Sequence, residues 1–490
     1  MKHLFFLFLV LFSNAVATER PNVIFIMADD LGYGDLSCYG ANHFETPACD
    51  QLAAQGMRFT DAHSPSAVCS PTRYSVLTGR YAWRSWLKNW VLMEGHPLLI
   101  DEDRLTMGKI FQQAGYATGC IGKWHLGWGT ELNPDFGAGV KPGPLEVGFD
   151  SYFGPPYSHN SSKALEVFVR GRQIIGLQPG EKYRDKEVMA RTRRKLEDTA
   201  IELSKEAVAF VEQHKDEPFF LYYPTTNIHF PLTPNSRFKG QTKAGVYGEF
   251  VVEFDWAVGE LVKALDRLEL TEKTLVVVTS DNGARPPGKT KELEAFGDHP
   301  CNGPWRGTKR MIYEAGHRVP LIVSWPGKVA KGSVSDETVC LTDFFATFAG
   351  MLSQKVPRDA GEDSYDLTKL LRGESYPKPL REATVHHSVA GQFAIRKGDW
   401  KLIEGSGDGD YPRKADGKMD VKTYKPRRDE ETGEWVEMDY FELTPDGTFQ
   451  LYNLKEDPAE KKDLAQEQPE KVAELKSLLD RYRKSGRSTP

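Results

Sequence analysis

Short apolar runs alternate with longer amphipathic segments along most of the chain. The apolar runs, rich in β-branched and aromatic residues, predict strands at residues 22–27, 116–122, 218–223, 274–279 and 320–325. The amphipathic segments predict helices at residues 47–56, 201–214, 250–268 and 343–352. Because continuous apolar runs are typical of strands covered on both faces, this alternation predicts an α/β fold with a mainly parallel sheet sandwiched by helices.

The pattern changes beyond residue 376. Two runs at residues 392–396 and 400–403 predict antiparallel strands around a Lys-Gly-Asp turn. After them we predict a long polar hairpin excursion, a strand, a closing helix and a loose tail, at residues 404–448, 450–454, 469–482 and 483–490. We therefore predict a large domain at residues 18–376 and a small C-terminal α+β subdomain with an antiparallel sheet at residues 377–490.

The N-terminus has the order of a secretory signal peptide. Lys2 and His3 precede an apolar run at residues 4–12, and Ala15-Val16-Ala17 fits a small-residue cleavage site. We predict that residues 1–17 are removed and that the protein is secreted or periplasmic. The run is too short to cross a bilayer and no later segment is apolar enough, so we expect no membrane span.

The amino-acid composition argues against some classes of protein and of binding partner. The chain has 490 residues, of which 27% are charged and 40% hydrophobic, as in ordinary globular proteins. Its net charge of −6 leaves no basic excess to meet phosphates, so we expect no nucleic-acid binding. The six cysteines could form disulfides in an exported chain, but their pairing cannot be deduced, and their spacing does not indicate zinc.

Charged or imidazole residues follow four of the predicted strands. A single pair of this kind is often a turn former, but sites in α/β sheets gather at the carboxyl ends of strands. The residues are Asp29 with Asp30, Lys123 with His125, His229, and Asp281 with Asn282. The carboxylate and amide members offer only oxygen ligands, and three carboxylates plus an amide favour calcium over magnesium. The sequence therefore predicts a divalent metal site at this edge.

A cysteine lies at the start of another predicted helix. Ser70 is the expected N-cap and Pro71 the first helical residue, and the helix should end near Gly79. Cys69 would then lie where unpaired N–H groups favour an anion, and Arg73 could point back to the same spot. For an isolated cysteine, a buried free thiol beside a surface arginine would be the simpler interpretation.

Several stretches resemble the formylglycine-dependent sulfatases, of the arylsulfatase type. Cys-x-Pro-x-Arg from Cys69, followed by Leu-Thr-Gly-Arg, resembles the signature of that family, and Asp-Asp-Leu-Gly-Tyr-Gly, Gly-Lys-Trp-His-Leu-Gly and Ser-Asp-Asn-Gly also match. The C-terminal Leu-Tyr-Asn-Leu-x-x-Asp-Pro-x-Glu stretch resembles bacterial carbohydrate sulfatases. The resemblance spans nearly the whole mature chain and implies an alkaline-phosphatase-like fold with a mixed, mainly parallel sheet.

The resemblance also implies a role for each candidate residue. Cys69 would be oxidised by a formylglycine-generating maturation enzyme to an aldehyde, whose hydrate is the nucleophile. His125 would take a proton from the hydrate, and His229 with Lys309 would protonate the leaving alcohol. Arg306 and Arg310 compete with Lys309 for its assignment. Stabilising cations would be Arg73, Lys123 and Lys309. One Ca²⁺ per chain would be held by Asp29, Asp30, Cys69, Asp281 and Asn282.

The expected function is therefore removal of sulfate from a sulfated carbohydrate. A phosphomonoesterase or phosphodiesterase on the same fold is an alternative, but such relatives usually have a Ser or Thr nucleophile and ligands for two metals. A non-catalytic sulfated-glycan-binding protein is a second alternative, if Cys69 stays unmodified. We expect loops at residues 129–163 and 283–305 to decide which sugar is bound.

Three tryptophans have helical spacing. Trp83, Trp86 and Trp90 are three and seven residues apart, so a helix would place them on one face. A sugar-stacking platform is one interpretation, and a core-facing aromatic stripe is the preferred one.

Overall fold

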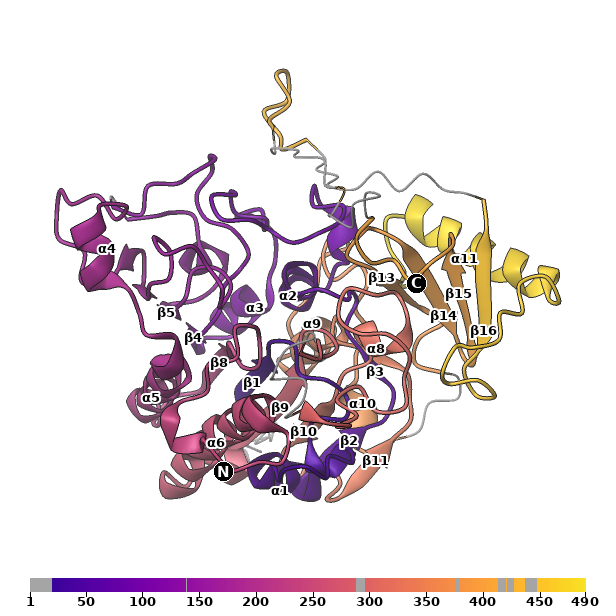
Figure 1. The fold of residues 1–490 in the computed structure, drawn as a ribbon, viewed down its shortest axis with the longest axis horizontal. Helices are drawn as coiled ribbons and strands as arrows, with labels where there is room; N and C mark the ends of the chain where they lie inside the picture. Colours follow the sequence, from indigo (N-terminus) through magenta and orange to yellow (C-terminus); the bar gives the residue numbers. More distant parts are fainter. Residues whose placement is uncertain are drawn as a thin grey trace, which may run out of the picture.

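The structure is a computed structural model, shown in Figure 1, and it describes residues 20–137, 139–287, 296–374, 379–412, 420, 427–436 and 447–490. The predicted signal peptide at residues 1–17 and the predicted domain boundary at residue 376 lie outside the described residues. Within those residues, no helix is long and apolar enough to cross a membrane.

A ten-stranded sheet forms the centre of the larger part, in the order β11-β2-β10-β9-β1-β8-β4-β5-β6-β7. Its central strands are parallel and confirm four predicted strands: β1 (Asn22–Ala28), β8 (Phe219–Pro224), β4 (Ala117–Ile121) and β9 (Thr274–Ser280). The fifth, β10 (Leu321–Ser324), runs antiparallel to β9, which makes the sheet mixed. The outer strands are β2 (Met57–Phe59), β5 (Ser151–Gly154), β6 (Val169–Arg170), β7 (Gln173–Ile174) and β11 (Ser333–Ser335).

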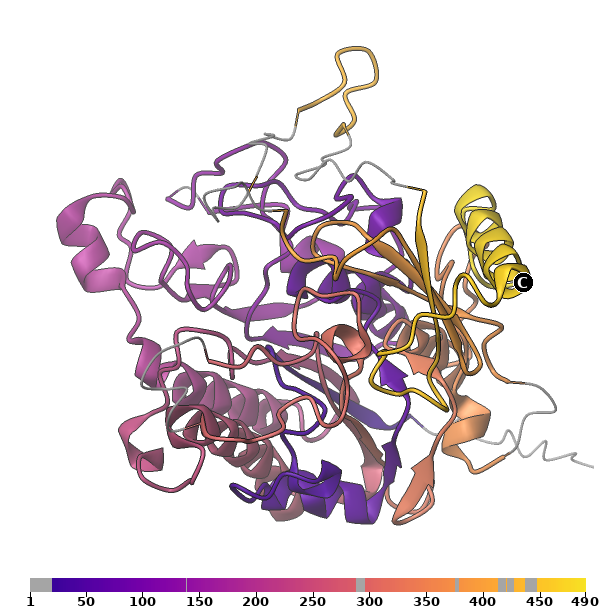
Figure 2. The same ribbon diagram turned by 45° about the vertical axis from the view of Figure 1, so that its right-hand side comes forward.

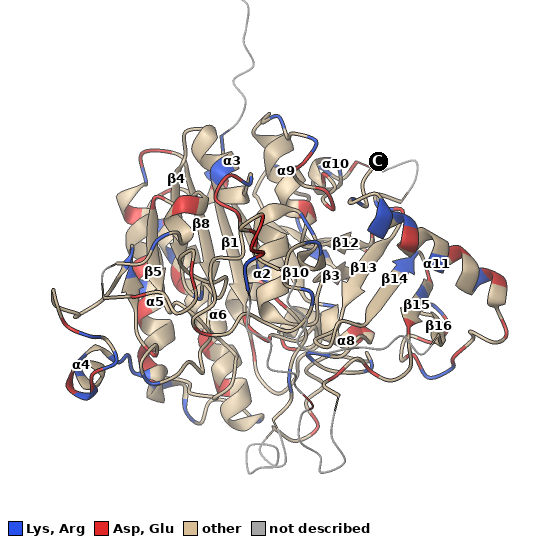
Figure 3. Cartoon of the chain, turned by 90° about the horizontal axis from the view of Figure 1, so that it is seen from above, with Lys and Arg blue, Asp and Glu red and all other residues tan. Residues whose placement is uncertain are grey.

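Helices cover both faces of this sheet, as its apolar runs predict. Figure 3 shows α3 (Met107–Gln113) and α9 (Asp343–Met351) on one side of the strands and α5 (Thr199–Gln213) and α6 (Gly245–Arg267) on the other. The remaining helices are α1 (Pro47–Gln55), α2 (Cys69–Thr78), α4 (Lys186–Thr192), α8 (Glu314–His317) and α10 (Thr368–Leu371).

Strand β1 contributes to two separate apolar cores. Val23, Phe25 and Met27 pack with residues of α2, α3 and α9, whereas Ile24 and Ile26 pack with residues of α1, α5 and α6. Successive strand residues point to opposite faces, so a strand buried on both faces must be apolar throughout. Because both cores hold β1 in place, the residues that directly follow the strand are held in place as well.

The C-terminal part contains a second sheet, which confirms the predicted antiparallel strands. Its order is β13 (Thr384–His387), β14 (Phe393–Lys397), β15 (Trp400–Glu404) and β16 (Phe449–Asn453), covered by α11 (Pro469–Lys484) (Figure 1). A short pair, β3 (Ala62–His63) with β12 (Val339–Cys340), completes the strands. Most of the predicted excursion at residues 404–448 lies outside the described residues.

The prediction of a loose C-terminal tail is wrong. The backbone N–H of Ser488 donates to Oδ1 of Asp363 at 3.1 Å, and the Tyr365 hydroxyl donates to the Ser488 carbonyl at 2.7 Å. These side chains lie far back in the sequence, so no local pattern reveals them. Figure 2 shows the chain end beside α11.

The prediction of a tryptophan stripe on one helix face is also wrong. Only Ala82–Arg84 form a short 3-10 helix there, and Trp90 has a positive φ of 66°. Trp83 stacks on Tyr81, whereas Trp86 contacts Trp435 and Trp90 contacts Tyr411. Trp86 and Trp90 therefore contact residues of the C-terminal part, and the three tryptophans do not line one face of a helix.

All six cysteines are free thiols in the structure, and five of them are buried. The disulfides that an exported chain allows are therefore not formed between any of these residues. Burial raises the pKa of the thiols of Cys69, Cys120 and Cys340.

A buried polar chain runs from β15 to the segment between β2 and β3. Lys401 contacts Nε2 of His317 at 3.1 Å, Nδ1 of His317 lies 3.1 Å from Nδ1 of His63, and Nε2 of His63 lies 2.8 Å from Oδ1 of Asp61. The Lys401 ammonium can only donate and the Asp61 carboxylate can only accept. Nε2 of His317 therefore accepts and its Nδ1 is the atom that donates, whereas Nε2 of His63 lies between the Asp61 carboxylate and Nη1 of Arg396, 2.9 Å away. His386 stacks on His317 with centroids 3.8 Å apart.

We expect this cluster to make the folded state sensitive to acid. Burial lowers the pKa of all three histidines from 6.5, in a cluster whose other charged groups are Asp61, Glu314, Glu460, Lys401, Arg318 and Arg396. The unfolded chain takes up protons below pH 6.5 that the folded chain excludes, so the free energy of unfolding falls as pH falls. Each histidine that stays neutral to pH 5 contributes a loss of about 2 kcal/mol.

The variant His386→Phe keeps the stacked ring but removes one titrating group. Its loss of unfolding free energy between pH 7 and pH 5, measured by urea denaturation, should be smaller than that of the wild type by about 2 kcal/mol. Equal losses in the two proteins would show that His386 takes up its proton as readily in the folded state as in the unfolded state.

Candidate active site

The predicted site residues meet at one edge of the central sheet. Asp29 and Asp30 follow β1, Asp281 follows β9, and hydrogen bonds join the two strand ends: the Asp30 N–H donates to Oδ1 of Asp281 at 3.2 Å. Lys123 follows β4 and donates to both carboxylate oxygens of Asp29, at 2.9 and 2.7 Å. Parallel neighbours end at the same edge, which brings residues distant in sequence into contact.

Helix α2 supplies the cysteine. It begins at Cys69 itself, with Val68 as an N-cap that has no side-chain hydrogen bond, so the prediction of Ser70 as N-cap is wrong. The Ser70 hydroxyl instead accepts from the Leu92 N–H at 3.2 Å. The helix ends as predicted at Gly79, with φ of 65°, where a Cβ would lie only 2.8 Å from Phe345. Cys69 is thus in the first turn of a fully buried helix.

Three cations neutralise the buried carboxylates. Arg73 donates to Oδ2 of Asp281 through Nε and Nη2, at 3.0 and 2.6 Å, and its Nη2 lies 3.5 Å from Asp29. Lys309 donates to Oδ1 of Asp30 at 2.5 Å. Burial alone would raise the pKa of Asp30, but the charge of Lys309 and hydrogen bonds from Lys309 and Asn282 hold it below its ordinary value. The Asp30 carboxylate therefore remains ionised although it is buried, whereas burial outweighs the charge of Arg73 at Asp281 and raises the pKa of that carboxyl to about 6.

The oxygen atoms at this edge fit a hard divalent cation. The three carboxylates converge with Asn282, whose Nδ2 donates to Oδ1 of Asp30 at 2.9 Å. Oδ1 of Asn282 is buried without a hydrogen-bond partner among the described residues. A buried acceptor without a partner is costly unless a ligand uses it, and this donor set is the one that calcium prefers. The sulfur of Cys69 lies in the same group as Asp29 and Asp281.

His125 faces the cysteine. Its Nδ1 lies 3.3 Å from the Cys69 sulfur, and its Nε2 lies 3.0 Å from the Leu92 carbonyl. The carbonyl can only accept, so the ring proton is on Nε2 and the lone pair of Nδ1 points at position 69. Burial and the charges of Lys123 and Arg73 lower the pKa of His125 well below 6.5. The ring is therefore a neutral base beside the predicted nucleophile.

His229 lies on the other side of Asp30. Its Nδ1 donates to the Phe230 carbonyl at 2.6 Å, and its Nε2 lies 4.0 Å from Oδ2 of Asp30. Burial and the charge of Lys309 lower its pKa to about 3, so Nε2 carries a lone pair when no ligand is bound. A bound sulfate ester would bring negative charge to Nε2 and favour the protonated ring.

The two arginines that compete with Lys309 point elsewhere. Arg310 pairs with Asp410 at 3.2 Å, and Arg306 lies over the ring of Tyr313 at 3.7 Å. Of the three neighbouring cations, Lys309 is the one in contact with the carboxylate cluster. The sequence alone could not decide between Lys309 and the two arginines, because the side chains of loop residues do not follow a periodic direction.

Backbone strain marks three positions in the site. Asp30, His125 and Arg310 have positive φ values of 71°, 55° and 85°. Such conformations are costly for residues other than glycine and gather at functional sites. No sequence pattern predicts these backbone conformations. Nor does the sequence identify two further groups of the site: the Leu92 carbonyl orients His125, and the Ser158 hydroxyl lies 3.5 Å from Nε2 of His229.

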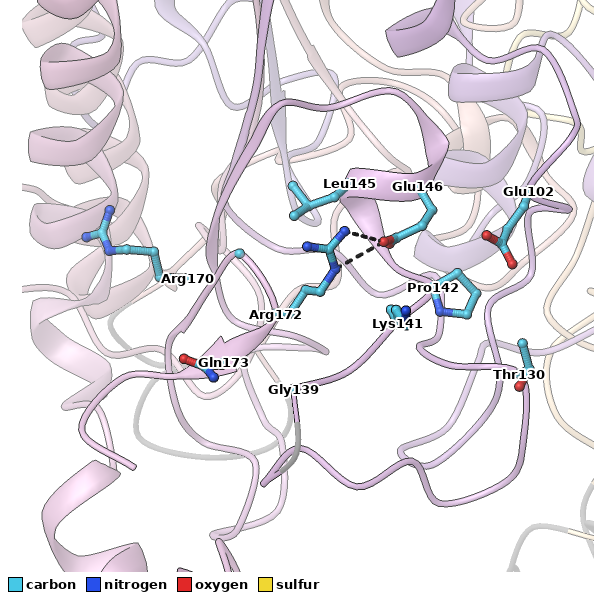
Figure 4. A pocket seen from close by; sticks show the side chains of 11 residues that line it. Glu102, Thr130, Gly139, Lys141, Pro142, Leu145, Glu146, Arg170, Arg172 and Gln173 are labelled. Atoms are coloured by element: carbon cyan, nitrogen blue, oxygen red, sulfur yellow. Dashed lines mark hydrogen bonds and ion pairs between the residues drawn. The ribbon is translucent and has the colours of Figure 1, made fainter. Parts of the chain in front are cut away.

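A separate hollow of about 1020 Å³ lies beside residues 139–146 and 170–173 (Figure 4). Its arginines are neutralised: Arg172 donates to Oε1 of Glu146, and Arg170 pairs with Glu206. None of the predicted site residues lines it. We therefore place the active site at the strand ends and not in this hollow.

Comparisons with known proteins agree with this geometry. The model of the Sulfatase family matches residues 21–354, and the N-sulphoglucosamine sulphohydrolase C-terminal family matches residues 305–426. An N-acetylgalactosamine-6-O-sulfatase from Bacteroides thetaiotaomicron is 36% identical, covering 96% of this chain and 94% of that protein. Arylsulfatase A from Homo sapiens is 34% identical, covering 81% and 77%.

A solved structure is similar throughout its length. It is a Bacteroides thetaiotaomicron sulfatase, described with the metabolism of multiple glycosaminoglycans, with a TM-score of 0.81 and 34% identity. The match covers 95% of this chain and 100% of that one. The residues that the Sulfatase family model matches include the strand ends that carry the site. The chain therefore belongs to the sulfatase family, and it is a sulfuric ester hydrolase.

Proposed function

We propose that this sulfatase removes sulfate from a sulfated carbohydrate, with a formylglycine hydrate at position 69 as the nucleophile. The main support for the proposal is the position of Cys69. Its sulfur lies 3.3 Å from Nδ1 of the neutral His125 ring and close to Asp29 and Asp281. The curated relative named for N-acetylgalactosamine-6-O-sulfate supports a sugar substrate.

Each of two histidines makes one proton transfer in the proposed reaction. One hydroxyl of the hydrate loses its proton to solvent as its oxygen bonds to sulfur, and the bond from sulfur to the sugar oxygen breaks. The sugar oxygen keeps that electron pair and takes a proton from His229, assisted by Lys309. His125 then takes the proton of the second hydroxyl, the aldehyde carbonyl reforms, and sulfate leaves by cleavage of the C–O bond. Water adds to the aldehyde and restores the hydrate. Release by elimination avoids a second attack at sulfur.

Asp29, Asp30, Asp281, Asn282 and position 69 would hold one Ca²⁺. When bound, the ion supplies positive charge for the sulfuryl oxygens. Arg73, Lys123 and Lys309 add fixed cations in a dry site, where such interactions are strongest. We further propose that a formylglycine-generating enzyme matures the chain, and that the protein is secreted or periplasmic after loss of residues 1–17.

The test of this function is sulfate release by the matured protein. We expect hydrolysis of 6-O-sulfated N-acetylgalactosamine or another sulfated sugar from a panel, and little hydrolysis of phosphate mono- and diesters. Faster turnover of the phosphate esters would favour the phosphatase alternative. Tight binding of sulfated sugars without any turnover, in protein whose residue 69 is shown to be formylglycine, would instead favour a binding protein.

The calcium assignment has a test that does not depend on activity. Asp281→Ala removes a charged ligand and the partner of Arg73, so calcium affinity should fall by at least about tenfold. Elemental analysis should find about one calcium per wild-type chain and less in the variant. Asp480→Ala, which removes a carboxylate that pairs with Lys476 on α11, is the matched control and should retain calcium. Unchanged affinity in Asp281→Ala would rule the assignment out.

A further inference from the structure

A segment of the C-terminal part lies against the loop that carries Lys309. The Asp408 carbonyl accepts from the Ile312 N–H at 2.8 Å, and the Gly407 carbonyl accepts from the Tyr313 hydroxyl at 3.2 Å. The Gly409 carbonyl accepts from the Ala390 N–H at 3.3 Å. Residues 407–411 are therefore fixed beside the active site, although they follow the second sheet in sequence.

Backbone hydrogen bonds connect this region to the walls of the site. The Arg310 N–H donates to the Ala67 carbonyl at 2.8 Å, two residues before Cys69. The Arg310 carbonyl accepts from Val389 at 2.9 Å, and the Val389 carbonyl accepts from Trp90 at 2.8 Å. Arg310 directly follows Lys309, and Trp90 lies two residues before Leu92, which orients His125. Arg310 and Trp90 therefore lie within two residues of Lys309 and of the residue that orients His125.

The side chains here form an aromatic and charged surface. The rings of Trp90 and Tyr411 lie 4.6 Å apart, and the Arg310 guanidinium lies 4.7 Å from the Tyr411 ring. Burial raises the pKa of Tyr411 while the charges of Arg310 and Lys309 oppose that rise, which is consistent with a phenol near the catalytic lysine. We call these residues, with Asp410, the rim cluster.

One carboxylate oxygen of the rim cluster has no hydrogen-bond partner in the part of the chain that the structure describes. Arg310 holds Oδ2 of Asp410 at 3.2 Å, whereas Oδ1 is buried without a hydrogen bond among the described residues. The Asp410 side chain is only 13% exposed. Leaving a buried carboxylate oxygen without a hydrogen bond is costly, so its presence here indicates that a ligand donates to it.

We propose that the rim cluster binds the sugar ring of the substrate, with Oδ1 of Asp410 accepting a hydrogen bond from a ring hydroxyl. Trp90 and Tyr411 present apolar ring surface that suits the C–H face of a pyranose. Arg310 fixes the carboxylate and offers N–H donors to further sugar oxygens. The inference rests on the proposed function and deepens it: the larger domain performs the sulfate chemistry, and Asp410 and Tyr411 of the C-terminal part join Trp90 and Arg310 in recognising the sugar.

The experiment compares two substrates that differ in their hydroxyl groups. Asp410→Ala should lower kcat/KM for 6-O-sulfated N-acetylgalactosamine by about 10- to 100-fold, mainly through KM, because a hydrogen bond to a charged group is lost. For 4-nitrophenyl sulfate, which has no hydroxyl groups, the loss should be much smaller. Asp410→Asn keeps the shape and still offers an amide oxygen, so it should show the same selectivity with a smaller loss. Asp480→Ala is the control, and its ratio of the two activities should match the wild type.

The outcomes separate this inference from the proposed function. Equal fractional losses on both substrates in Asp410→Ala and Asp410→Asn would overturn the sugar subsite and leave the sulfatase proposal intact. Wild-type protein that hydrolyses 4-nitrophenyl sulfate but no sulfated sugar would overturn both. A selective loss on the sugar alone, in variants with wild-type thermal stability, supports both.

Discussion

Cys69→Ala is expected to lower kcat for sulfate ester hydrolysis by on the order of 10⁴-fold or more, because the variant lacks the atom from which the nucleophile is made. No neighbouring side chain can replace it. His125 would then face an apolar methyl group, and the remaining cations could bind the ester but not attack it. The measurement is single-turnover release of sulfate from 4-nitrophenyl sulfate and from a sulfated sugar.

Two further samples separate chemistry from folding. Protein made without a maturation enzyme should keep its thiol, bind sulfated ligand and turn over poorly, and the mass of the peptide that holds residue 69 reports its state. Cys340→Ala, at another buried cysteine outside the site, should stay active. Full activity in protein whose residue 69 is an unmodified thiol would refute the formylglycine mechanism.

His229→Ala is expected to lose activity in proportion to how poorly the alcohol leaves. A sugar alkoxide is a strong base and needs a proton in the transition state, whereas a nitrophenolate ion leaves without one. General acid catalysis typically contributes about 10²- to 10⁴-fold. We therefore expect a loss of that size in kcat/KM on sulfated sugars and a much smaller loss on activated aryl sulfates.

His125→Ala is the matched comparison, because its proposed proton transfer comes after the alcohol has left. It should slow the elimination of sulfate alike for both substrate classes, which appears in kcat when that step limits turnover. The experiment is kcat/KM for wild type and His229→Ala across leaving groups of graded acidity. A loss that is equal across the series would assign the proton to Lys309, which contacts the same carboxylate as His229.

The fold could be predicted well where burial on both faces dictates the sequence. Strand β1 must be apolar at every position, since alternate residues enter different cores. The same argument gave the other central strands, and polar residues directly after them marked the site edge. Local rules failed where the partner is distant: Ser70 bonds to Leu92 and does not cap its helix, and Trp86 and Trp90 face the C-terminal part.

The sequence by itself determined the sheet, the family resemblance and the residue types at the strand ends, because these depend on short-range periodicity and on motifs a few residues long. Only the tertiary structure decided which cation meets which carboxylate, that Lys309 and not Arg310 contacts Asp30, and that Arg310 pairs with Asp410. Loop side chains have no periodic facing direction, so their contacts depend on how distant segments pack. A buried acceptor without a partner, as in Asn282 and Asp410, exists only once the surrounding chain has excluded water.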